Sequence, residues 1–161
     1  MKPRIDFSKV APGALRAMFG LGQYLRSSGL EEKLLHLLEF RVSQINGCAY
    51  CLDMHSKDLR AAGESEQRLY LLDAWRESPF YTERERAALA WAEAVTLVAD
   101  NHVPDDVYEQ ARTQFTEAEL VNLTLAVVAI NGWNRLSISF RNVPGSYQPE
   151  QFERMVKQMA A

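Results

Sequence analysis

The sequence predicts an all-α fold, and three observations support it. Apolar residues recur at helical spacing in a stripe that ends at Asn46-Gly47, a dipeptide typical of a helix break. Capping boxes at residues 82–85 and 116–119 mark where two further helices begin. Residues 136–140 alternate with a period of two, but a single strand without a partner is not stable. The stripe consists of Leu30, Leu34, Leu37, Leu38, Val42 and Ile45.

Two helical segments are expected after the stripe. The first begins near Cys48 and ends at Gly63, since glycine is common just past the last residue of a helix. Residues 66–75 continue the helical pattern until Pro79 interrupts it. The capping box at Thr82 then opens a long helix.

The second half of the chain continues in the same way. The helix after Thr82 runs to about Ala99, and Pro104 fits as the first residue of a short helix. The capping box at Thr116 opens an apolar stretch from Leu120 to Ile130. A last helix is expected to begin near Pro149.

The sequence pattern at the end of the leucine-rich helix recurs 85 residues later in the chain. We therefore expect two helix-break Ile-Asn-Gly units of similar shape, with coincidence between two amphipathic helices as the alternative. Trp133 takes the place of Cys48 in the second copy, so the second copy lacks the cysteine chemistry. The matching residues are Leu38, Val42, Ile45, Asn46 and Gly47 in the first copy and Leu123, Val127, Ile130, Asn131 and Gly132 in the second.

Length and charge narrow the function. We expect residues 1–161 to form one domain, because a chain of this length can bury roughly 70% of its unfolded surface. A net charge of −3 without a dense basic block argues against nucleic-acid and anionic-membrane partners. No signal-peptide core or membrane-spanning stretch is visible, so we expect a cytoplasmic protein.

Cys48, Cys51 and His55 carry the chemistry that the sequence indicates. Residues three, four and seven apart fall on one helix face, so both sulfurs and the imidazole converge on one patch. A thiolate attacks peroxides and disulfides, an imidazole can take its proton, and a second thiol one turn away can close a disulfide. The spacing therefore predicts a redox dithiol with its own base and a reversible Cys48–Cys51 disulfide.

Two other interpretations of the cysteines stay open. Buried thiols on a helix are often plain small hydrophobes. A structural zinc ion could take both cysteines and a histidine, but only His36 and His102 remain as further nitrogen ligands and no second Cys-x-x-Cys exists. In a reducing cytosol a close pair of cysteines is more often catalytic or metal-binding than a static cross-link.

The context of the cysteines resembles the alkylhydroperoxidase D-like branch of the carboxymuconolactone decarboxylase family. The resemblance covers most of residues 30–142. It implies an all-helical fold that assembles as trimers or hexamers, and a cofactor-free, metal-free, thiol-dependent reduction of hydroperoxides. The segments that carry it are Arg41–Asp58, Gly63-Glu64, Trp75-Arg76, Glu83–Glu93 and Ile130–Arg135.

The sequence departs from the family pattern at one position. The family usually has a glutamate twelve residues before the first cysteine, in a proton relay with the histidine that follows the second, and His36 stands there in this chain. The relay could be His36 with or without Glu39, or it could be weakened, and His36 could equally be a packing residue. We expect Glu39 to be solvated or salt-bridged rather than catalytic.

The resemblance gives each residue a role. Cys51 attacks the hydroperoxide, His55 at i+4 holds its proton, His36 completes the relay, and Cys48 resolves the sulfenic acid to a disulfide. A competing physical argument favours Cys48 as the lower-pKa thiol, because it stands at the helix N-terminus. The expected reductant is a small dithiol, a lipoyl protein or a thioredoxin-like protein. The rival function is a redox sensor or binding protein that uses the dithiol as a switch, and a metal-binding scaffold is third.

We predict that the protein is a symmetric oligomer, either a homotrimer or a homohexamer. The leucine-rich helix and residues 120–130 carry more apolar surface than one small helical layer covers, and the family resemblance points the same way. Light scattering at micromolar concentration measures the mass directly. A monomer would contradict this prediction.

Overall fold

The computed structural model describes residues 2–149, and all regular structure within them is helical. The expected all-α class is therefore confirmed. None of these helices is long and apolar enough to cross a membrane. The α-helices are α1 (Phe7–Val10), α2 (Pro12–Arg26), α3 (Glu32–Asn46), α4 (Ala49–Ala61), α5 (Glu66–Leu71), α6 (Glu83–Thr96), α7 (Val98–Asn101), α8 (Asp105–Gln114) and α9 (Glu117–Phe140), and a 3₁₀ turn, η1 (Leu72–Ala74), follows α5.

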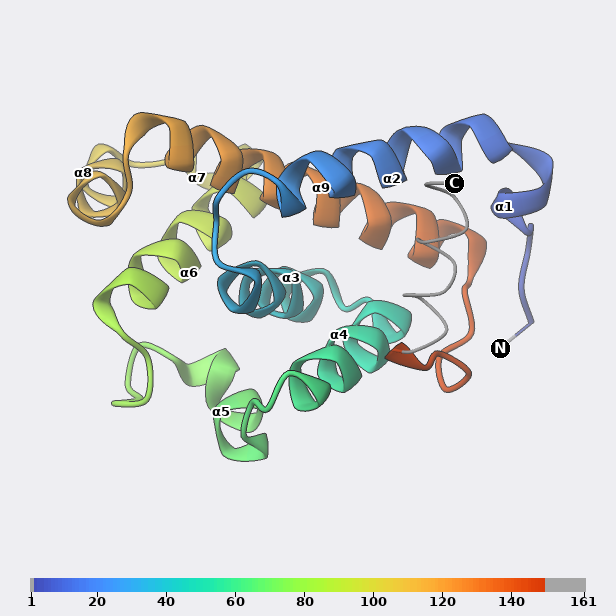
Figure 1. Ribbon diagram of the computed structural model, residues 1–161, viewed down its shortest axis with the longest axis horizontal. Coiled ribbons are helices and arrows are strands. Elements are labelled where there is room, and N and C mark those ends of the chain that lie inside the picture. The colour runs from blue at the N-terminus through green and yellow to red at the C-terminus, as the bar shows by residue number, and fades with distance from the viewer. Residues whose placement is uncertain (1, 150–161) are drawn as a thin grey trace.

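The helices are arranged around α3 and α9. Helix α3 packs against α4, α6 and α9, while α2 lies along α9, as the blue and orange ribbons of Figure 1 show. Helix α6 also contacts α8 and α9. Helices α1 and α2 were not predicted from the sequence.

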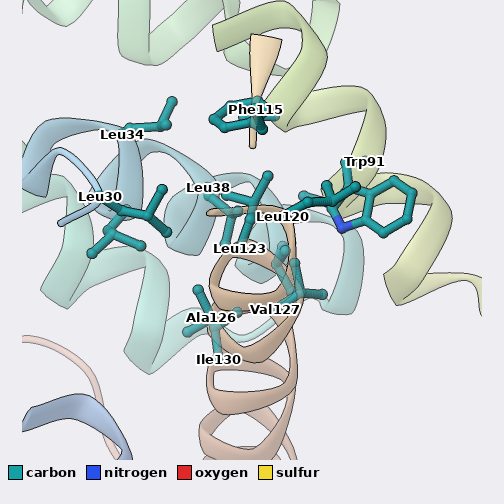
Figure 2. Packing of buried hydrophobic residues seen from close by; sticks show 14 of the residues in the cluster. Leu30, Leu34, Leu38, Trp91, Phe115, Leu120, Leu123, Ala126, Val127 and Ile130 are labelled. Carbon is teal, nitrogen blue, oxygen red and sulfur yellow. The ribbon is translucent and has the colours of Figure 1, made fainter. Parts of the chain in front are cut away.

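The main core lies where α9 meets α3 and α6. Figure 2 shows Leu120, Leu123 and Val127 of α9 packed beside Leu38 of α3 and Trp91 of α6. The Trp91 indole donates a hydrogen bond to the Thr124 hydroxyl at 3.0 Å, so its polar atom is satisfied where the ring is buried. Burial of each leucine is worth about 1.5–3 kcal/mol relative to exposure. This cluster fixes α9 against α3.

A second core cluster lies on another face of α3. Leu37 and Phe40 of α3 pack there with Leu59 of α4 and Leu89 of α6. Helix α3 therefore buries two of its faces, one in each cluster. Its remaining face, which carries His36 and Glu39, is only partly buried.

The predicted helix starts are confirmed at both capping boxes. The Thr82 hydroxyl accepts from the Glu85 amide at 3.2 Å, and the Glu85 carboxylate accepts from the Thr82 amide at 2.8 Å. Thr116 and Glu119 repeat this arrangement. Two boundaries differ from expectation: α6 ends at Thr96, before the separate turn of α7, and Pro104 is the N-cap of α8, one residue before the helix.

The break at Asn46-Gly47 is confirmed. Gly47 has a φ of 65°, a left-handed conformation that glycine adopts without steric cost. Its amide donates to the Gln44 carbonyl at 3.1 Å, and the Cys48 amide donates to the Ser43 carbonyl at 3.0 Å. The chain thus turns directly from α3 into the cysteine motif.

The expected second helix break at Asn131-Gly132 is wrong. Helix α9 continues through it to Phe140, so residues 136–140 are helical as well. Glycine permits a turn without forcing one, and here continued burial of Asn134 and Ser137 favours the helix. Gly132 instead allows close packing, since a Cβ at this position would lie 3.0 Å from Met18 Cε of α2.

The two Ile-Asn-Gly segments nevertheless meet in space. The Asn46 side-chain amide donates to Asn131 Oδ1 at 3.0 Å and to Asn134 Oδ1 at 2.8 Å. The Asn134 amide donates to Ser43 Oγ at 3.0 Å, and the Asn131 amide donates to Thr96 Oγ1 at 3.1 Å. This asparagine network ties the end of α3 to α9 and α6. The helix expected near Pro149 lies outside the described residues.

We predict that Asn46→Ala lowers the free energy of unfolding by about 1–3 kcal/mol. The substitution removes the hydrogen-bond donor of Asn134 Oδ1, which is fully buried. Leaving a buried acceptor unsatisfied costs about 1–3 kcal/mol. Urea denaturation measures the change. Gln110→Ala, at an exposed helical position of α8, is the control and should change stability by less than about 0.5 kcal/mol. Equal stability of both variants would contradict a structural role for the network.

Candidate active site

Cys48 and Cys51 form a disulfide at the start of α4. Cys48 is the N-cap residue, and its sulfur accepts from the Cys51 amide at 3.4 Å. The two Cα atoms are 5.3 Å apart, within the usual range for a disulfide. Both residues are only 1% exposed. The predicted pairing is present, with both sulfurs beneath the surface.

His55 lies one helical turn after Cys51 on α4, as the spacing predicts. It is 5% exposed, and neither ring nitrogen has a hydrogen-bond partner within residues 2–149. Burial lowers the pKa of His55 below its ordinary value, against the opposing charge of Glu39. The imidazole is therefore neutral at neutral pH and able to accept a proton.

Glu39 stands between the two histidines. Its Oε2 lies 3.5 Å from His55 Nδ1 and 3.2 Å from His36 Nδ1. Burial raises the pKa of the Glu39 carboxyl, but the electrostatic influence of the His55 ring and the hydrogen bond from His36 outweigh that effect, so the pKa is lowered. Glu39 is salt-bridged, as expected, but its position between the two rings was not visible in the sequence. Only the packing of α3 on α4 brings it opposite His55.

His36 is the outermost member of this group. Its ring centre lies 6.5 Å from that of His55, and Glu39 bridges the two. Burial lowers the pKa of His36, yet the hydrogen bond with Glu39 and the neighbouring carboxylates raise it above its ordinary value overall. His36 thus shares a carboxylate with His55. We call His36, Glu39 and His55 the His–Glu–His group.

The chain after α9 returns to cover α4. The Gly145 amide donates to Asp53 Oδ2 at 2.9 Å, and Lys57 Nζ donates to the Tyr147 carbonyl at 3.1 Å. The Tyr147 hydroxyl donates to Asp58 Oδ1 at 2.7 Å. Burial raises the pKa of the Asp58 carboxyl, although Tyr147 and the two histidines oppose that rise. These contacts fix the segment around residues 145–147 on the helix that carries the dithiol.

The segment that carries the site matches the model of one protein family. The model of the carboxymuconolactone decarboxylase family matches residues 12–94. The chain belongs to this family. The matched range contains α2, the whole Cys-x-x-Cys motif and all three members of the His–Glu–His group.

Two similar proteins agree with this assignment. The uncharacterized protein YdfG of Bacillus subtilis is 41% identical over 142 residues, which is 88% of this chain and 97% of YdfG. The alkyl hydroperoxide reductase AhpD of Nocardia farcinica is 40% identical over 48 residues, 30% of this chain and 27% of AhpD. The predicted resemblance to the alkylhydroperoxidase D-like branch is confirmed.

A solved structure extends the similarity to the fold. ATU0492 from Agrobacterium tumefaciens, a protein of unknown function proposed to be an AhpD antioxidant defence protein, is 47% identical. The two structures superpose with a TM-score of 0.87, covering 91% of this chain and all of ATU0492.

We predict that Glu39→Gln lowers the pKa of His36, because burial then acts with less opposition. A histidine whose pKa is raised on folding adds stability that is present below about pH 6.5 and is lost as pH rises through the folded pKa. The variant should lose that stability at low pH. NMR titration of the three histidine rings measures the shift.

Glu32→Gln is the matched control for this titration. Glu32 lies on the same helix, 3.8 Å from His36 Nε2, but its side chain is largely exposed. Its removal should lower the pKa of His36 less than removal of Glu39. An unchanged His36 titration in Glu39→Gln would contradict the assigned pairing.

Proposed function

We propose that this protein is a thiol-dependent peroxidase that reduces hydroperoxides through Cys48 and Cys51, with the His–Glu–His group moving the proton. The observation that carries the proposal is the disulfide at the start of α4, one turn before a buried, neutral His55. Membership of the carboxymuconolactone decarboxylase family supports peroxide-related chemistry.

The first step is attack by the Cys51 thiolate on a hydroperoxide oxygen. His55 takes the thiol proton, the O–O bond breaks, and the leaving alkoxide receives a proton from the imidazolium. The products are an alcohol and a sulfenic acid on Cys51. Glu39 stabilises the imidazolium that forms on His55, because its carboxylate lies 3.5 Å from Nδ1.

The second step is condensation of the two cysteines. The Cys48 thiol attacks the sulfenic acid of Cys51, releases water and forms the disulfide. The Cα separation of 5.3 Å fits that bond, so Cys51 is protected from further oxidation.

The third step returns both thiols to the reduced form. A dithiol reductant attacks the disulfide, forms a mixed disulfide and closes its own disulfide on release. The sulfurs are almost fully buried, which favours a small dithiol or a lipoyl arm over the broader surface of a thioredoxin-like protein.

The roles of the two cysteines follow from two opposing effects. The imidazole of His55 favours Cys51 as the attacking sulfur, since it stands at i+4 on the same helix. The amide of Cys51 and the N-terminus of α4 favour the thiolate of Cys48. We assign the attack to Cys51, because a base in reach takes the proton during the reaction itself.

A redox sensor that works through the same dithiol is the second candidate function. Both cysteines are 1% exposed, so a reductant reaches the disulfide slowly and the oxidised form persists, as a switch requires. The two functions differ in turnover. A sensor loses two thiols per peroxide dose, while a peroxidase consumes peroxide continuously when a reductant is supplied.

We predict that steady-state peroxide consumption with a small dithiol is abolished by Cys51→Ser and slowed about 10²-fold by His36→Ala. His55→Ala should be at least as harmful. His36→Glu, which restores the usual family residue, should hold or raise the rate. His102→Asn is the control, because His102 lies on an exposed turn outside the site.

Mass spectrometry of peroxide-treated Cys48→Ser completes this test. Without a resolving thiol, Cys51 should progress to sulfinic or sulfonic acid, whereas the wild type loses two hydrogens. Overoxidation of Cys48 in Cys51→Ser, with an unreactive Cys51 in Cys48→Ser, would reverse the two roles. Loss of two thiols without turnover under any reductant would favour the sensor.

A further inference from the structure

The His–Glu–His group has the composition of a transition-metal site. One ligand atom from each of His36, Glu39 and His55 lies within 4.8 Å of the other two. Two imidazoles and a carboxylate are ligands that zinc takes in sites with three protein ligands and one open position. Magnesium and calcium prefer oxygen ligands, so this group is suited to a softer divalent ion.

The distances agree with a single ion held between the side chains. Glu39 Oε2 lies 3.2 Å from one histidine nitrogen and 3.5 Å from the other. Ligands about 2.0–2.1 Å from a tetrahedral zinc ion are about 3.3–3.4 Å apart, by simple geometry from the usual bond lengths. The ligand nitrogens of the two histidines lie within 4.8 Å of each other, so enclosing the ion requires the two rings to move toward one another.

The unpartnered ring of His55 is a second, independent observation. Buried polar atoms almost always have a hydrogen-bond partner, yet both nitrogens of His55 lack one among residues 2–149. Its Nδ1 faces the Glu39 carboxylate, on the side where the three ligand atoms converge. An ion at that point would coordinate Nδ1 of His55. His36 and Glu39 are each 26% exposed in their side chains, so a hydrated cation can reach the group from solvent.

We propose that His36, Glu39 and His55 bind one divalent transition-metal ion such as Zn²⁺, and that the bound ion blocks the proton relay. With the ion on Nδ1 of His55, the single proton of the neutral imidazole lies on Nε2, which then has no lone pair to accept another proton, so binding and relay exclude each other. The site uses neither cysteine, and it therefore persists in the disulfide form. Binding stands by itself, while inhibition rests on the proposed peroxidase function.

The test titrates zinc chloride into the disulfide form of the full-length protein, where the thiols are not available as ligands. Calorimetry should give one site. Because changes that only touch a ligand's supporting partner weaken metal binding about 10–100-fold, loss of a ligand in His36→Asn or Glu39→Gln should weaken it at least about 100-fold. His102→Asn, which changes the remaining histidine, should bind as the wild type does.

The visible spectrum of bound cobalt(II) reports the ligand types in the wild-type protein, so this test does not depend on a variant that folds. Its visible bands should be those of a low-coordinate site, with no thiolate charge-transfer band in either redox state. Binding only after reduction, with a thiolate band, would move the site to the cysteines and overturn the proposal. Zinc affinity weaker than about 1 mM in the disulfide form would also overturn it.

Peroxide consumption at each zinc concentration separates this proposal from the proposed function. Inhibition should follow the same concentration dependence as binding and be reversed by a chelator. Tight binding to a protein that never consumes peroxide would leave the metal site standing and reject the peroxidase. Turnover unaffected by bound zinc would overturn the blocking role.

Discussion

The hydrogen bonds of Asn46 fix the geometry on which the dithiol depends. This residue ends α3, and its amide reaches both Asn131 and Asn134 of α9. Gly47 then turns the chain through a left-handed conformation, and Cys48 caps the next helix. The cysteines are thus attached to the main core through a short turn of fixed conformation. A polar network in this position is directional, and apolar packing alone would leave the rotation of the turn less defined.

The same constraint brings the acid and the base together. Helix α3 buries Leu38 in one cluster and Leu37 in the other, so its rotation is fixed on two sides. The face that remains carries Glu39, and α4 is held against it by the short turn. His55 then lies 3.5 Å from the carboxylate although it is 16 residues away in the chain. The proposed proton relay therefore depends on the packing of α3 as much as on the cysteine motif.

What the sequence could predict follows from the range of the interactions. The capping boxes, the turn at Gly47 and the spacing from Cys51 to His55 are local, and all are found. The position of Glu39 depends on the angle between two helices, which spacing along one helix does not encode. The helix break predicted at Gly132 is absent, because glycine tolerates a turn without requiring it. Burial of the helical turn that follows keeps α9 intact. Residues 12–26 carry an apolar stripe at helical spacing, formed by Leu15, Met18, Phe19 and Leu25, so α2 was predictable from its sequence as well as from its packing on α9.

The histidine at position 36 changes the electrostatics of the relay. A glutamate there would stand three residues from Glu39 on one helix face, and repulsion would raise the pKa of one of the two carboxyls. His36 replaces this repulsion with an attraction, so Glu39 stays ionised, while the charge of His36 lowers the pKa of His55. The exchange also turns two hard oxygen ligands and one nitrogen into two nitrogens and one oxygen, a ligand set that favours a transition metal. The residue at position 36 therefore bears on both proposed uses of the group, and the two compete for the imidazole of His55.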